Sequence, residues 1–221
     1  MNYNRTEMNQ RAFSFVYGCA LRDAILQKAF IGKKDWIEKV TVAQEPVRKY
    51  INSVLAGEFN KDNDKEKHEE AFLTTAIDVC NIINQNKPDD AEDTFSFGNA
   101  QKLINIIVKH MYAHTYSLHL LGAANIRDNF RFCHCPMDSI MLWHVWRTYK
   151  EKFGSDARKE DLGNEFLKSW GSEDFDTNEN ERHQPDRYVR YQKAIERLKG
   201  TEILPIEYDY LVWKNEESIE N

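Results

Sequence analysis

Apolar residues recur every three to four positions over most of this chain, a spacing that predicts helices. The helices expected from this pattern and from capping residues lie at about 9–30, 35–40, 46–55, 68–84, 97–116, 138–153 and 186–199. Glycines at 32, 57 and 200 stand where three of them should end. Residues 125–137 read as irregular, residues 172–184 as polar and unstructured, and residues 203–213 as an apolar tail that packs back on the body. No stretch predicts a strand convincingly, so the pattern favours an all-α fold.

The helix expected at 97–116 differs from the others because apolar residues surround most of its axis. A helix of this kind is buried at the centre of a domain. Thr94 or Ser96 can cap its start. Its polar exceptions are spaced three and four apart, which places them on one strip of the helix. They are Gln101, Lys102, Asn105 and Lys109.

Composition and length indicate one compact unit. The chain has 221 residues, 41% of them hydrophobic, which is enough for a sizeable core. We expect a single helical domain over 1–221, with two lobes as a finer division (about 1–60 plus 185–221, and about 61–184). No apolar run approaches the roughly 20 residues that cross a bilayer. Four cysteines without framework spacing suggest reduced thiols, so we expect a cytoplasmic protein with no membrane contact. The sequence does not fix the oligomeric state, for which we favour a monomer.

The formal net charge is −6, which counts against nucleic acid as a ligand unless the cations are segregated. They are partly segregated. The acidic residues cluster at 58–70, 89–93, 173–181 and 216–220. The middle of the chain, from Lys102 to Arg147, is poor in acids, so the field there can be positive although the whole chain is negative.

Lys102 and Asp138 are the candidate catalytic pair. Burial disfavours the charged form of an amine, and a neutral amine can attack a sugar C1′ and form a Schiff base. That chemistry needs a carboxylate to stabilise the positive charge on the sugar and to move a proton. Asp138 lies beside Pro136 at an expected helix start, where backbone N–H groups would fix its side chain.

Two segments carry a resemblance to a known family. The run Phe97 to Lys109 (FGNAQKLINIIVK), followed by Cys135 to His144 (CPMDSIMLWH), resembles the core of the 8-oxoguanine DNA glycosylases of the helix-hairpin-helix superfamily. In that family a lysine opens a buried helix and an aspartate follows a Pro-x-Asp turn. The archaeal branch is the most similar, because it has a second lysine where Lys109 stands. The resemblance covers about residues 94–150. It departs from the family at the hairpin before the lysine, where Gly98 is the only glycine between residues 94 and 101.

The resemblance implies a two-lobed, all-α glycosylase architecture that acts on duplex DNA with one base flipped out. It implies that Lys102 is the Schiff-base nucleophile and Asp138 the catalytic carboxylate, with abasic-site lyase activity and without a cofactor. An oxidised purine is the implied substrate base. Gln101, Asn105, Lys109 and Gly98 are the expected substrate-binding residues.

The same residues could instead have purely structural roles. Lys102 could extend from a core helix to water, Asp138 could be only an N-cap, and Asn105 and Lys109 could form the solvated edge of their helix. A zinc site at His110, His114 and His119 would need further ligands, for which the adjacent residues 133–135 are poorly placed. We therefore expect no metal.

Two other functions remain open. The chain could be a non-catalytic helical module whose acidic loops bind a protein partner. Alternatively, Arg127 and His134 form an Arg-x6-His pattern that resembles the ribonuclease motif of HEPN domains.

Overall fold

The computed structural model describes residues 5–25, 41–87, 94–122, 126–163 and 186–216, and all statements below concern this part of the chain. It contains eight α-helices, three short 3-10 helices and no strand. The α-helices are α1 (Arg5–Ile25), α3 (Gln44–Leu55), α4 (Lys65–Gln85), α5 (Phe97–Leu120), α6 (Ser139–Phe153), α7 (Ser155–Leu162), α8 (Asp186–Lys199) and α9 (Pro205–Glu216). The all-α prediction is confirmed for these residues.

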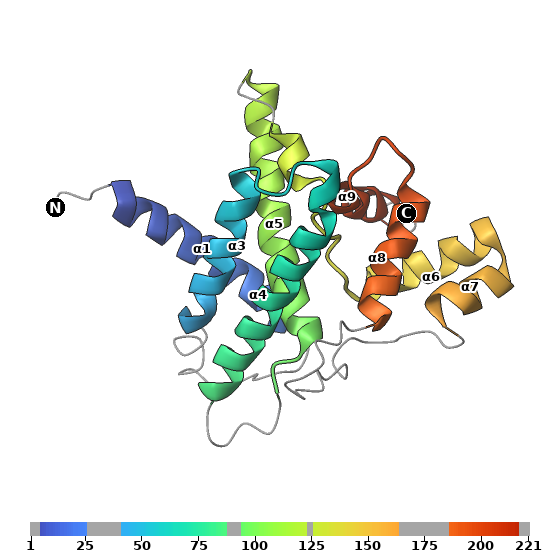
Figure 1. The fold of residues 1–221 in the computed structure, drawn as a ribbon, viewed down its shortest axis with the longest axis horizontal. Coiled ribbons are helices and arrows are strands. Elements are labelled where there is room, and N and C mark those ends of the chain that lie inside the picture. The colour runs from blue at the N-terminus through green and yellow to red at the C-terminus, as the bar shows by residue number, and fades with distance from the viewer. Residues whose placement is uncertain (1–4, 26–40, 88–93, 123–125, 164–185, 217–221) are drawn as a thin grey trace.

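Helix α5 is the central element, as its apolar circumference predicts. It stands in the middle of the molecule, with α1, α3 and α4 around it (Figure 1). Helix α1 packs along α5, and α4 packs against both α3 and α5. Leu103, Ile104 and Ile107 are fully buried. Helix α5 therefore supplies the core against which the other helices of this group bury their apolar faces.

Side-chain caps define where α5 and α6 begin. Ser96 and Asn99 bond reciprocally at the start of α5, where the Asn99 backbone N–H donates to Ser96 Oγ and the Ser96 N–H donates to Asn99 Oδ1. Asn99 Nδ2 also donates to the carbonyl of Ala24, which ties this turn to the end of α1. Asp138 is the N-cap of α6, as predicted. Both caps satisfy backbone groups that a helix start leaves without partners.

The second group of helices comprises α6, α7, α8 and α9. Helix α8 packs on α6, α7 and α9, and α6 also contacts α9 (Figure 1). Helix α7, which the pattern did not predict, follows α6 after Gly154, whose φ of 91° suits glycine. Helix α8 thus packs on α6 and α7, and α9 packs on α6 and α8. The division into two lobes expected from the sequence, which joined α8 and α9 to the first 60 residues, stays a prediction.

Several expectations fall outside the described residues, namely the helix at 35–40 and the polar stretch at 172–184. None of the described helices is long and apolar enough to cross a membrane. Cys19, Cys80, Cys133 and Cys135 are free thiols. The described residues contain no cluster of three or more His, Cys, Asp or Glu side chains that could hold a metal ion.

Candidate functional site

The first turns of α5 meet the turn before α6 through the side chain of Gln101. This amide is fully buried and pairs with both backbone groups of Met137. Gln101 Nε2 donates to the Met137 carbonyl at 2.8 Å, and the Met137 N–H donates to Gln101 Oε1 at 3.4 Å. Gln101 Nε2 also donates to the carbonyl of Gly98. Lys102 and Asp138 are the chain neighbours of the two paired residues, so this pairing brings both segments of the predicted catalytic pair to one region.

Asp138 has a fixed orientation. Its Oδ1 accepts the backbone N–H of Met141 at 2.8 Å, and its backbone is extended, with φ −118° and ψ −175°. A carboxylate in this position is stabilised by the positive end of the helix dipole. The side chain is partly exposed, so the cap leaves it open to solvent.

Lys102 is also partly exposed, on the second turn of α5 beside the buried Gln101. Within the described residues, no ion pair or hydrogen bond joins it to Asp138. The two hollows described for this molecule are lined by other residues. The catalytic pairing of Lys102 with Asp138 remains a prediction.

Asn105, one turn after Gln101, is fully buried, so its interpretation as part of a solvated edge is wrong. Its Nδ2 donates to Gln101 Oε1 at 3.2 Å and to the hydroxyl of Tyr188 at 2.9 Å. The Tyr188 hydroxyl lies 2.9 Å from His134 Nδ1. Gln101, Asn105, Tyr188 and His134 thus form one buried polar network. A ligand could reach Gln101 or Asn105 only if these bonds opened.

Lys109 lies on α5 two turns after Lys102, and its side chain is held by α9. Its ammonium forms an ion pair with the buried carboxylate of Asp209 and lies 5.3 Å from the ring centroid of Tyr210. The Tyr210 hydroxyl donates to the Lys109 carbonyl. Lys109 therefore links α5 to α9, and any contact with a substrate would be additional to this role.

A second glutamine repeats what Gln101 does. The Cys135 N–H donates to Gln192 Oε1 at 3.1 Å, and Gln192 Nε2 donates to the Cys135 carbonyl at 2.8 Å. The segment from Cys133 to Met137 has no regular secondary structure, and Cys133, Cys135 and Met137 are buried. Buried backbone groups need partners, and the two amide side chains, from α5 and α8, supply them as a neighbouring strand would.

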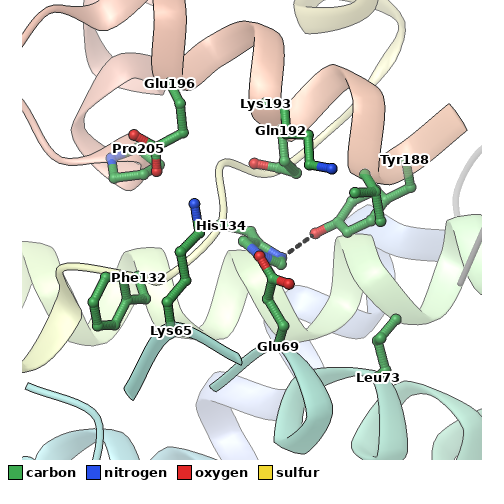
Figure 2. Close-up of a pocket in the computed structure, with 11 residues that line it drawn as sticks. Lys65, Glu69, Leu73, Phe132, His134, Tyr188, Gln192, Lys193, Glu196 and Pro205 are labelled. Atoms are coloured by element: carbon green, nitrogen blue, oxygen red, sulfur yellow. Dashed lines mark hydrogen bonds between the residues drawn. The ribbon is translucent and has the colours of Figure 1, made fainter. Parts of the chain in front are cut away.

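A hollow lies between α4 and α8 and opens to solvent (Figure 2), and its enclosed part has a volume of about 30 Å³. Its polar lining comes from Lys65 and Glu69 of α4, from His134, and from α8. The α8 residues are Tyr188, Gln192, Lys193 and Glu196. Burial, then His68 and Lys65, lower the pKa of His134 well below its usual 6.5, so its ring is neutral.

The guanidinium group of Arg127 is hydrogen-bonded to Glu202 and Glu207. Its Nε and Nη2 donate to the two carboxylate oxygens of Glu207, and Nη2 also donates to the carbonyl of Glu202. The Tyr112 hydroxyl donates to the same Glu207 carboxylate. Arg127 lies in a 3-10 helix (Arg127–Phe130), and this ion pair joins that helix to α9. The ribonuclease hypothesis would require Arg127 to leave these partners.

The comparisons with known proteins found no match among family models, curated proteins or solved structures. No family is identified. The chain has 221 residues, and the part of it that the structure describes is all-helical.

The sequence pattern overlooked the network formed by Tyr188, Gln192 and His134. A signal was present, because Tyr188 and Gln192 are four residues apart, as are Gln101 and Asn105. Polar residues at this spacing share one face of a helix, and here both faces are buried. Periodicity could not show that they face the segment between Cys133 and Met137, which carries no pattern of its own.

Proposed function

We propose that this chain is a DNA N-glycosylase with abasic-site lyase activity, in which Lys102 is the nucleophile and Asp138 the catalytic carboxylate. The observation that carries the proposal is the pairing of Gln101 with both backbone groups of Met137. This pairing holds the second turn of α5 against the turn that presents Asp138. The two residues that the resemblance selects are therefore neighbours of a contact between segments 36 positions apart.

The chemistry follows from the two groups. Asp138 accepts a proton from the Lys102 ammonium, and the free amine attacks C1′ of a nucleotide whose base has been flipped out. The N–C1′ bond forms while the glycosidic bond breaks, and the departing base takes up the proton. The carboxylate stabilises the positive charge on the sugar during this step. Opening of the sugar ring gives an imine, from which the 3′-phosphate is eliminated before water releases Lys102.

Borohydride reduction tests the proposal, because it converts the imine into a stable cross-link between protein and DNA. We expect wild-type protein to be trapped on duplexes that contain an abasic site or 8-oxoguanine. The Lys102→Gln variant should lose the trap, whereas Lys49→Gln should keep it. Lys49 is a matched control because its side chain is 75% exposed on α3.

Asp138→Asn separates catalysis from folding, since asparagine also caps a helix. It should fold normally and form the cross-link about 100-fold more slowly, as for loss of a proton-transfer group. Absence of any wild-type trap, or equal trapping by Lys102→Gln, would overturn the proposal.

A second candidate function rests on the exposed end of α5. Tyr116, Leu118, Leu120 and Leu121 are 51%, 42%, 70% and 83% exposed there. Figure 1 shows this end of the helix projecting from the molecule. Apolar side chains gathered at a projecting end favour an interaction module that binds a partner protein. The trapping experiment distinguishes the two functions, because an interaction module forms no imine and does not retain DNA.

A further inference from the structure

The side chain of His134 lines the hollow between α4 and α8. Its hydrogen bond to Tyr188 bears on which ring nitrogen carries the proton. The Tyr188 hydroxyl accepts a hydrogen bond from Asn105 Nδ2 at 2.9 Å. The hydroxyl can direct its own hydrogen to His134 Nδ1, 2.9 Å away.

A Tyr188 hydroxyl that donates in this bond would fix the tautomer of His134. A neutral imidazole carries one N–H, and a ring whose Nδ1 accepts a hydrogen bond carries its proton on Nε2. His134 lines the hollow and lies in the middle of its polar side chains (Figure 2). Within the described residues, Nε2 has no hydrogen-bond partner. The hollow therefore offers an N–H donor that a ligand oxygen can satisfy.

The charges around this donor favour an anion. Lys65 lies close enough to His134 and His68 for its charge to lower the pKa of both rings. At the mouth of the hollow, Glu196 is paired with Lys199 at 3.3 Å. Lys65 and Lys193 then outnumber the remaining acid, Glu69.

The rest of the lining is apolar. Leu73, Phe132, Val189 and Pro205 contribute to its walls. A polar base within apolar walls is typical of sites for small organic ligands, in which a few polar groups fix the orientation.

We propose that this hollow binds a small organic anion, whose carboxylate or phosphate oxygen accepts the His134 Nε2–H while its charge lies near Lys65. The apolar part of the ligand would contact Phe132 and Val189. Tyr188 acts as a positioning residue, since it holds the imidazole in the tautomer that donates. This site is separate from the Lys102 region and does not depend on the proposed glycosylase activity.

Nitrogen-15 NMR of the histidine side chains tests the proposal with two probes, inorganic phosphate and propionate. We expect His134 to be neutral and protonated on Nε2 in the free protein. Its Nε2–H resonance should shift saturably with at least one probe. The stronger probe then indicates whether the natural ligand carries phosphate or carboxylate.

Variants make the test specific. Lys65→Gln should weaken binding about five-fold, as for one partly screened charge, and Lys49→Gln should not change it. Tyr188→Phe should weaken binding and let the ring populate both tautomers, which a purely structural role of Tyr188 would not produce. A proton on Nδ1 in the free protein, no saturable shift with either probe, or equal binding by Lys65→Gln would overturn the proposal.

Discussion

At the scale of single residues, two glutamines have the largest consequences. Gln101 and Gln192 each pair with the N–H and the carbonyl of one residue in the extended segment before α6. An unpaired backbone group in the interior costs roughly 1–3 kcal/mol. Each glutamine therefore stabilises the folded chain through these hydrogen bonds as well as through the packing of its side chain. The same contacts position Asp138 and His134, which neighbour the paired residues.

Replacing Gln101 with methionine keeps the volume of the side chain and removes both bonds to Met137. We expect Gln101→Met to lower the free energy of unfolding by about 2–4 kcal/mol, measured by urea denaturation. Gln85→Met provides the control, because Gln85 is exposed at the end of α4 and should change stability by less than about 0.5 kcal/mol. Equal stabilities of the two variants would show that the pairing contributes nothing.

At the scale of elements, the irregular segment after α5 is held in place by charge. The 3-10 helix at Arg127 is fastened to α9 through Glu207, which also accepts the Tyr112 hydroxyl. Burial favours the neutral form of Glu207, but hydrogen bonds from Arg127 and Tyr112 outweigh it and lower the pKa of Glu207 below its usual 4.5. The connection is therefore strongest while Glu207 is ionised.

This lowered pKa gives a testable pH dependence. Above pH 4.5 the carboxylate is ionised in both the folded and the unfolded chain, so its full stabilisation is present. As the pH falls below 4.5 the unfolded chain takes up the proton first, and the stabilisation is lost. We expect Glu207→Gln to cost about 2 kcal/mol at pH 7 and progressively less below pH 4.5, measured by urea denaturation across pH.

Glu151→Gln is the matched control, because Glu151 pairs with Arg147 while both side chains are more than half exposed. It should cost less than about 1 kcal/mol at pH 7. A cost for Glu207→Gln that stays constant from pH 7 down to pH 3 would contradict the assignment.

At the scale of the whole molecule, α5 connects the two groups of helices. It packs on α1 and α4, bonds to Tyr188 of α8 through Asn105, and pairs with Asp209 of α9 through Lys109. A helix shared in this way makes independent unfolding of the two groups unfavourable, since either would lose its buried contacts with α5.

We therefore expect one cooperative unfolding transition, with coincident far-UV and near-UV circular dichroism curves. Ile107→Ala, in the fully buried part of α5, should lower stability by about 2–5 kcal/mol and shift both curves together. Leu118→Ala on the exposed end of the same helix should change it by less than about 0.5 kcal/mol. Two separated transitions would show that the helix groups are independent lobes.

Local sequence features predicted the helices well. The apolar circumference of α5, the caps at Ser96 and Asp138, and glycines at 57 and 200 each act within a few residues, so their effect can be read from spacing alone. Helix α7 was overlooked, because its eight residues include only one that is buried, Leu162, and so carry almost no apolar pattern. Lys102 and Asp138 could be named from sequence, but their mutual geometry could not.

The sequence by itself determined that this protein forms helices, that α5 is the central one, and that Asp138 caps the start of α6. These properties depend on short-range periodicity and on backbone hydrogen bonding within a few residues. Only the tertiary structure decided that Gln101 and Asn105 are buried, that Lys109 pairs with Asp209, and that His134 faces a hollow. These contacts join residues 36 to 100 positions apart. Whether a polar side chain meets water, a ligand or another part of the chain depends on how the helices pack, which no local pattern specifies.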